Sequence, residues 1–545
     1  MKKWLASALA ILLFLSAFTG CSSSNNTGDA RDSFSASFSG VNSMNPIVSQ
    51  SRPDHHVFYL TQAQLIRLYD GKIQCDAAES YEKNDDSTIY TFHLRRDLKW
   101  SSDTPLDAAD FEYGVYCMLA PEFASPRSSQ WYAIKNAEAF SIGEITDWSE
   151  VGVEALDNST IQFTLERPMN DFDLTIANKH IYPINEAFVK SIGVDKLGSS
   201  VDTLLYAGPY VLTEWVLNSS MKFAKNDNYW GAAASFPTKN IQLLSIQDAN
   251  TMVAMFENGE LDAIIEIPDQ YNDYLAEYRY SIAGGGFSFL WLNKQGRNDD
   301  AAALMGNINF RQALTYGFSR SSIFPSVSAN LPANFIIDTN FLSPSGNIFI
   351  DEYPINTVPL SGDIDKAKEY LSKAMSELGY NSVAELPVID FVTYEYGTHK
   401  LLCETIIDQW KQNLGIESVK FTQYAIGILL EKFYNLDYDI LSLPVETSVR
   451  PTDIMVSLMT GGEYNNGIWS NERFDSLVTQ AVAELDPVKK AVLIQQAEQI
   501  FMDDAHLVPI YLEEHAHAIK HYVSGFKMGA TDGFEFQNLI VSNER

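Results

Sequence analysis

The 545-residue sequence predicts an α/β protein, and two kinds of residue pattern indicate this class. Residues 88–100 and the segment "STIQFTLERP" (159–168) alternate apolar and polar residues, which is typical of half-buried antiparallel strands. Later segments carry apolar residues at helical spacing and alternate with short strands such as "PVIDFVTY" (387–394) and "VPIYLEEHAHAI" (508–519). Strands interleaved with helices favour an α/β architecture.

The two early strands are each expected to bury one face. These faces are Tyr90, Phe92 and Leu94 in the first strand, and Ile161, Phe163 and Leu165 in the second. Between the strands, Asp107 is predicted to cap a helix that begins at Ala108, with Asp110 in its first turn near the positive end of the helix dipole.

Three longer helices follow in the second half of the chain. In residues 363–380 the apolar stripe is Ala367, Tyr370, Leu371, Ala374 and Leu378. Gly379 then stands where a helix-ending glycine is expected. Residues 404–416 show a similar stripe that includes Trp410, and Asp486 with Pro487 predicts the start of a third helix. "AGGGF" (283–287) is expected to be a loop that leads into the strand "SFLWLN".

The first twenty residues have the features of a secretory signal. Lys2 and Lys3 precede an apolar run over 4–18, which is shorter than the roughly 20 residues that span a bilayer. "FTGC" (18–21) resembles the lipobox of bacterial lipoproteins, which implies cleavage after residue 20 and a lipid on Cys21. Polar residues 21–32 then form a flexible tether. The alternative is a plain secreted protein with an unmodified cysteine.

The composition limits the functions that remain. Seventy acidic residues against 38 basic ones give a net charge of −32, which disfavours binding to nucleic acid or to anionic lipid. No later apolar run is long enough to span a membrane, so any role in transport needs a partner. Cys75, Cys117 and Cys403 are expected to be buried thiols, although their pairing stays open, and there is no C-x-x-C.

The sequence contains no convincing catalytic motif. G-x-S-x-G, H-E-x-x-H, a Walker loop and a dinucleotide-binding G-x-G-x-x-G are all absent, so we expect neither an enzyme nor a cofactor. "EEHAHAIKH" (513–521) is the only dense histidine group, and a surface or edge position is expected for it rather than a metal site.

A series of segments resembles the solute-binding proteins of oligopeptide ABC importers (bacterial extracellular solute-binding proteins, family 5). These are "SMNPIV", "TFHLRRDLKWSSDTPLDAADFEYGV", "AGPYVLTEWVLNSSMKFAKNDNYW", "MFENGELDAIIE", "FLWLNKQ" and "NINFRQALTYGFSR". They extend the resemblance from about residue 33 to residue 545. The family usually has Gly at the position of Asp103 and an acidic residue at that of Ala109, and both differences fall in turn or surface positions.

The resemblance implies a type II periplasmic-binding-protein-like fold, with three lobes around a ligand cleft and a two-strand hinge. Lobe I is expected at 33–68, 205–296 and 515–545, lobe II at 69–204, and lobe III at 297–514. Closure of the two large lobes over a ligand would give the shape that a permease recognises.

In the family two segments pair with the main chain of the bound peptide, which accepts many sequences because every peptide presents the same N–H and C=O groups. The resemblance maps these segments to residues 50–54, which include Ser51, Arg52 and Pro53, and to residues 443–451, which include Val445, Glu446 and Thr447.

The ends of the peptide need charged partners. An Asp that pairs with the peptide amine in the family is replaced here by Thr447, so Glu446, Asp453 or neither takes that role. Arg52 and Arg450 are candidates for the ligand carboxylate, or else form surface salt links. Asn293 matches a cleft asparagine of the family, and Trp291 is a candidate pocket wall, whereas Trp410 is expected in the core.

The expected function is therefore capture of oligopeptides by a monomeric, lipid-anchored protein outside the cytoplasm, periplasmic or at the cell surface, with delivery to the permease subunits of an ABC importer. Two alternatives stay open. One is the same fold with another cargo, such as a nickel chelate, an oligosaccharide or a signalling peptide. The other is a secreted hydrolase or an adhesin on a lipid tether.

Overall fold

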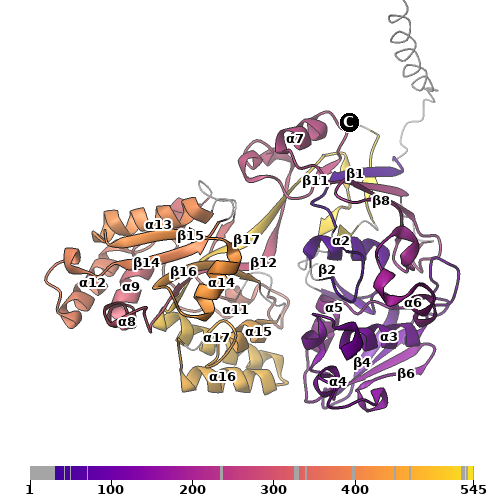
Figure 1. The fold of residues 1–545 in the computed structure, drawn as a ribbon, viewed down its shortest axis with the longest axis horizontal. Coiled ribbons are helices and arrows are strands. Elements are labelled where there is room, and N and C mark those ends of the chain that lie inside the picture. Colours follow the sequence, from indigo (N-terminus) through magenta and orange to yellow (C-terminus); the bar gives the residue numbers. More distant parts are fainter. Residues whose placement is uncertain are drawn as a thin grey trace, which may run out of the picture.

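The computed structural model describes residues 31–41, 43–49, 51–69, 72–232, 237–324, 330–337, 341–395, 399–446, 450–465, 468–528, 534–535 and 538–543. The predicted signal peptide and Cys21 lie outside these described residues. Among the described helices, none combines the length and the apolar character that crossing a bilayer requires. The chain forms two bodies that a central pair of strands connects (Figure 1).

The first body contains lobes I and II. We group with lobe I the elements β1 (Ser33–Ser37), α2 (Arg52–Thr61), β8 (Tyr210–Val216), β9 (Ser220–Lys225), β10 (Asn240–Leu244), α7 (Ala249–Glu257), β11 (Ala263–Ile264), β18 (Val523–Ser524), β19 (Lys527–Met528), β20 (Phe534–Glu535) and β21 (Ile540–Val541). The helix α6 (Glu186–Ile192) falls inside the range 69–204 expected for lobe II, but its Val189 packs in the hydrophobic cluster of lobe I. Lobe II is built from β2 (Ile66–Tyr69), β3 (Lys72–Cys75), β4 (Ala78–Lys83), β5 (Ile89–Leu94), α3 (Ala108–Leu119), α4 (Ala137–Ser141), β6 (Val153–Asp157), β7 (Thr160–Thr164) and α5 (Phe172–Lys179).

The second body is lobe III. It is built from α8 (Asp299–Gly306), α9 (Ile308–Tyr316), α10 (Arg320–Ile323), β13 (Leu331–Pro332), α11 (Phe349–Glu352), α12 (Ile364–Leu378), β14 (Ile389–Tyr394), α13 (His399–Leu414), β15 (Val419–Tyr424), α14 (Ile426–Tyr434), β16 (Ile440–Glu446), α15 (Pro451–Ser457), α16 (Glu472–Ala483) and α17 (Pro487–Asp504). Two long strands, β12 (Arg279–Leu292) and β17 (Leu507–Ile519), belong to both bodies.

One sheet runs through both bodies in the order β15-β14-β16-β12-β17-β11-β1-β10-β9-β8. The pairs β14–β15, β14–β16, β1–β10 and β1–β11 are parallel, whereas β12 pairs antiparallel with both β16 and β17. Lobe II has its own four-stranded antiparallel sheet in the order β4-β5-β7-β6. Because β12 and β17 continue from lobe I into lobe III, they form the connection about which the two bodies can turn.

Each lobe has its own hydrophobic core. Lobes I and II each bury one large cluster, and lobe III buries two, one on each face of its sheet. Along β12, Phe287, Phe289 and Trp291 enter one of these clusters while Leu290 and Leu292 enter the other. This alternation follows from the two-residue period of a strand that is covered on both faces.

The predicted strand faces and helix ends are confirmed at the following positions. Tyr90, Phe92 and Leu94 are all buried on β5, and Ile161 and Phe163 are buried on β7. Asp107 caps α3 in a reciprocal arrangement with Asp110, and Asp486 caps α17 with Pro487 in its first turn. Gly379 ends α12 with a left-handed φ of 78°, which glycine adopts without steric cost.

The prediction of a loop at "AGGGF" is wrong, because Ala283 to Phe287 lie inside β12. The strand is irregular there, since Ala283 pairs with Glu514 and the next partners are Phe287 and Leu512. The extra residues on β12 form a bulge, and glycine is suited to this position because β17 side chains cover it. A Cβ at Gly284 would lie 2.5 Å from His515 Nε2, and one at Gly286 would lie 2.5 Å from Glu513 Cδ.

Candidate ligand-binding site between the lobes

The two segments predicted to bind a ligand lie in different bodies. Residues 51–54 form the start of α2 in lobe I, and residues 443–446 form the end of β16 in lobe III. In Figure 1, α2 and β16 stand on opposite sides of the connecting strands β12 and β17. A ligand that touches both segments would therefore bridge the two bodies.

The start of α2 is fixed by local hydrogen bonds. Ser51 is the N-cap, and its Oγ accepts the backbone N–H of Asp54 at 3.3 Å. Pro53 lies in the first turn, where a missing N–H costs nothing. The buried carboxylate of Asp54 accepts the hydroxyl of Ser49 at 2.6 Å. The side chain of Arg52 lies outside the described residues.

His55 of α2 belongs to a group of aromatic rings and cationic side chains. His55 Nδ1 is 3.4 Å from the hydroxyl of Tyr182, and its ring centroid is 5.6 Å from that of His180. Burial and the nearby charges of Arg127 and Lys179 lower the pKa of His55 to about 3, so its imidazole is neutral at pH 7. The buried guanidinium of Arg127 donates to the carbonyls of Pro46 and His180 at 3.0 and 3.3 Å.

Sequence reasoning missed this group. Nothing in the local pattern connects His55 to His180, which is more than a hundred positions further along the chain.

The end of β16 leaves one edge open. Its partner β12 pairs with the whole strand, up to Glu446 opposite Gly286. Its other partner β14 pairs only as far as Ser442. Among the described residues, no strand pairs with that second edge at residues 443–446. Val445 is 9% exposed, while the side chain of Glu446 and all of Thr447 lie outside the described residues.

Trp291 and Asn293 have packing roles in this structure. Both are fully buried, and Trp291 packs its edge against Phe433 while its Nε1 donates to the Tyr464 carbonyl at 3.2 Å. The side-chain amide of Asn293 donates to the carbonyls of Leu436 and Tyr438 at 3.1 and 2.8 Å. The structure therefore places both in the interior of lobe III. Trp410 is a core residue as predicted.

Arg450 binds carboxylates of the protein itself. Its Nη2 lies 2.7 Å from Asp453 Oδ1, and its Nη1 lies 3.6 Å from Asp171 Oδ1 in lobe II. Of the two roles expected for Arg450, ligand carboxylate partner or surface salt link, these contacts correspond to a salt link. The side chain is 18% exposed and lies at the boundary between lobes rather than on an open surface.

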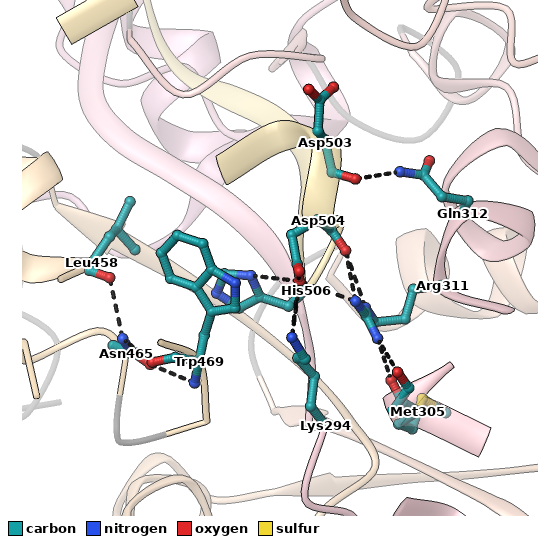
Figure 2. A network of polar contacts seen from close by, with 11 residues as sticks. Lys294, Met305, Arg311, Gln312, Leu458, Asn465, Trp469, Asp503, Asp504 and His506 are labelled. Atoms are coloured by element: carbon teal, nitrogen blue, oxygen red, sulfur yellow. Dashed lines mark hydrogen bonds and ion pairs between the residues drawn. The ribbon is translucent and has the colours of Figure 1, made fainter. Parts of the chain in front are cut away.

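A polar network fixes the lobe III ends of both connecting strands (Figure 2). Asp504, just before β17, is 3.2 Å from Lys294 Nζ, just after β12, and 3.0 Å from Arg311 Nη2. Burial alone would raise the pKa of Asp504, but His506, whose Nδ1 is 3.6 Å away, and the charges of Arg311 and Lys294 hold it well below its usual range. His506 stacks on Trp469 at 4.8 Å, and burial lowers its pKa to about 4.

The surface or edge position predicted for the C-terminal histidines is wrong for His517 but holds for His521, which is exposed. His517 is fully buried in the central strand β17, and its Nδ1 accepts the backbone N–H of Glu266 at 3.0 Å. His521 lies beyond the strand and packs against Tyr278 at 4.8 Å. Within the described part of the chain, no three His, Cys, Asp or Glu side chains are grouped so that they could hold a metal ion.

The three described cysteines are unpaired thiols. Cys117 and Cys403 are buried, as predicted, and burial raises the pKa of each thiol to about 12. Cys75 is only half-buried. Thiols with a raised pKa are protonated at neutral pH and therefore unreactive.

The sequence and the overall structure are similar to those of known proteins. The chain is 27% identical to the oligopeptide-binding protein OppA of Bacillus subtilis over 99% of both chains. The solved substrate-binding domain of an oligopeptide ABC transporter from Bacillus anthracis has a TM-score of 0.72 and 25% identity, covering 95% of this chain and all of that one. OppA of Listeria monocytogenes, solved with bound peptide, has a TM-score of 0.71 and 22% identity, with 95% and 100% covered.

These likenesses confirm the predicted type II periplasmic-binding-protein-like fold. Residues 72–466 match the family described as bacterial extracellular solute-binding proteins, family 5 (middle region). Because that match covers most of the sequence and the likeness to OppA extends over nearly all of it, the chain belongs to the family 5 extracellular solute-binding proteins of bacteria.

Proposed function

We propose that this protein captures oligopeptides between lobes I and III and delivers them to the permease of an ABC importer. The observation that carries the proposal is the open edge of β16 at residues 443–446. An extended peptide can add there as a further strand, and main-chain hydrogen bonds of this kind accept many peptide sequences. The relatives named as oligopeptide-binding proteins support the same class of cargo.

The first lobe contributes the start of α2. Ser51, Arg52 and Pro53 face the ligand in this proposal, and Val445, Glu446 and Thr447 complete the site from lobe III. A ligand that contacts both lobes only when they are closed binds the closed state better and shifts the population toward it. The permease then recognises the closed shape. The protein performs no chemistry on its cargo.

The charged ends of the peptide need partners of opposite sign. Glu446, which ends β16, is proposed to pair with the α-ammonium, because an unpaired buried ammonium would cost several kcal/mol. Arg52 is proposed for the carboxylate, since Arg450 is bound to Asp171 and Asp453. Asp453 is the less favoured partner for the amine, because it is already paired with Arg450.

The remaining elements of the proposal concern location and assembly. A lipid on Cys21 anchors a monomeric protein outside the cytoplasm, either in the periplasm or on the cell surface. The net charge of −32 supports a need for such an anchor, because anionic lipid would repel the folded body.

Native mass spectrometry tests the class of cargo directly. The chain without residues 1–21 is purified gently and its mass is recorded under non-denaturing conditions. A ladder of co-purified peptides, each replaceable by added peptide, is the expected result. A single bound metal or sugar mass, with no binding of added peptides, would contradict the proposal.

The role of Glu446 can be tested with paired ligands. We expect Glu446→Ala to weaken binding of a peptide with a free amine about tenfold, while the N-acetylated form of the same peptide loses little. Calorimetry measures both affinities, and Asp453→Ala is the matched comparison. Equal losses for the two ligands would remove Glu446 from the amine site.

A further inference from the structure

A second set of contacts joins the two bodies, away from the connecting strands. Figure 1 shows α5 of the first body facing α15 and α17 of the second. At this boundary Lys490 Nζ lies 3.0 Å from Asp171 Oδ2 and donates to Asn170 Oδ1 at 2.6 Å. Arg450 reaches the other oxygen of Asp171 at 3.6 Å. We call Asn170, Asp171, Arg450, Asp453 and Lys490 the clasp.

The lobe II side of the clasp is held firmly in place. The hydroxyl of Tyr90 donates to the Met169 carbonyl at 2.6 Å, and Lys83 Nζ donates to the Asn170 carbonyl at 2.5 Å. The side chain of Asn170 also crosses the boundary, where its Nδ2 donates to the carbonyl of Leu485 at 2.6 Å. Asp171 and its neighbour are therefore presented to lobe III by a fixed loop.

The lobe III side is equally well positioned. The guanidinium of Arg450 is gripped by both oxygens of Asp453, at 2.7 and 3.1 Å. Lys490 belongs to the first turn of α17, where its N–H donates to the carbonyl of the cap residue Asp486 at 2.9 Å. Because Asp453 already holds the guanidinium of Arg450, bringing Arg450 against lobe II costs less side-chain entropy.

The clasp differs from a surface ion pair in its burial. The side chains of Lys490, Arg450 and Asp171 are 12%, 18% and 20% exposed. The neighbouring pair of Lys489 and Asp486 on the same helix is 71% and 44% exposed. Exposed pairs contribute little because water and salt screen them, whereas partial burial strengthens the attraction. Two cations face two carboxylates in the clasp, so no charge is left over.

We propose that the clasp positions lobe III against lobe II before any cargo enters, and thereby sets the fraction of molecules that are ready to bind. The apparent dissociation constant of a ligand is its intrinsic value divided by that fraction. Because Asp171 and Lys490 lie outside the segments proposed to bind cargo, losing their contact should weaken all ligands by the same factor. This last step rests on the proposed function, whereas the effect on lobe separation does not.

Lobe separation can be measured without any cargo. Spin labels on Glu154→Cys in lobe II and Lys411→Cys in lobe III, both exposed positions, report the distance between the bodies in the full chain in detergent. Cys75→Ser removes the half-buried native thiol, and Cys21→Ser removes the thiol that a chain without the lipid would carry. We expect Asp171→Lys to lengthen and broaden the distance distribution, and 1 M salt to do the same to the unaltered clasp.

A charge swap separates the clasp from simple damage to the fold. Asp171→Lys combined with Lys490→Asp restores the attraction between these two positions but leaves Arg450 beside a lysine, so it should recover a large part of the short distance. Lys489→Asp makes the same charge change at the adjacent, exposed lysine and should have no effect. The proposal would be overturned if the single variants left the spin-label distances unchanged. It would also be overturned if the double variant showed distances as long as those of the single variants.

Peptide affinity tests the functional half separately. Each single clasp variant should weaken several unrelated peptides by a common factor of about 3 to 10, and the swap should recover a large part of the affinity. A larger distance between the lobes with unchanged peptide affinity would contradict the proposed link between the clasp and binding. If the unaltered protein binds no peptide, the proposed function fails, while the distance measurements still decide whether the clasp holds the lobes.

Discussion

Asp504 shows how one carboxylate can hold a junction of the chain together. It pairs with Lys294 at the end of β12 and with Arg311, whose side chain is 2% exposed. Asp504→Asn would leave that buried guanidinium without its charged partner, which typically costs about 3 kcal/mol. Urea denaturation should therefore show a loss of about this size in the free energy of unfolding.

The neighbouring residue Asp503 gives the matched control. Its exposed carboxylate accepts from Gln499 Nε2 at 2.9 Å, so Asp503→Asn should change the free energy of unfolding by less than about 0.5 kcal/mol. If both variants unfold alike, the network in Figure 2 does not stabilise the end of the hinge.

At the scale of elements, the bulged strand β12 depends on glycine. The side chains of Glu513 and His515 on β17 occupy the space above Gly286 and Gly284. We expect Gly286→Val to lower the melting temperature, because a branched side chain must displace Glu513, although valine itself favours strands. The expected loss is about 1 to 3 kcal/mol, measured by thermal denaturation.

Ser281→Val is the control on the same strand, because Ser281 is exposed and loses only a surface hydrogen bond from Arg279 Nε at 2.8 Å. It should leave the melting temperature nearly unchanged or raise it slightly. A melting temperature for Gly286→Val as high as that of Ser281→Val would show that the bulge tolerates a side chain and that the glycines are not required there.

At the scale of the whole molecule, buried neutral histidines set the response to acid. Burial lowers the pKa of His399 and His506 to about 4, and burial with nearby cations lowers that of His55 to about 3. In the unfolded chain these three histidines take up protons near pH 6.5, whereas in the folded chain they stay neutral until a much lower pH. The stability from these groups is therefore present above pH 6.5 and is lost as the pH falls toward 4.

Two buried carboxyls act in the opposite direction. Burial raises the pKa of Asp110 to about 6 and that of Glu498 to about 7, so both favour the folded state as the pH falls. Because more histidines than carboxyls are shifted, we expect the free energy of unfolding at pH 5 to be about 2 to 4 kcal/mol lower than at pH 7.5.

Urea titrations at the two pH values measure this difference. His506→Gln should reduce the difference, whereas His93→Gln, at a position with a 40% exposed side chain, should not. A chain that is as stable at pH 5 as at pH 7.5 would show that these histidines are not held neutral in the fold.

The sequence alone was sufficient to predict several strands and helix ends and to indicate the family of this chain. Period-two alternation located β5 and β7, and caps such as Asp107, Asp486 and Gly379 located helix ends, because each of these signals involves residues only a few positions apart. A series of segments along the chain indicated the family, and with it the type II periplasmic-binding-protein-like fold.

Only the tertiary structure decided which distant residues meet. It brought His55 to His180, Asp171 to Arg450 and Lys490, and the glycines of β12 under the side chains of β17. It also left the second edge of β16 open after Ser442. Contacts between residues hundreds of positions apart depend on how the strands are ordered and how the lobes pack, and no local pattern in a single sequence carries that information.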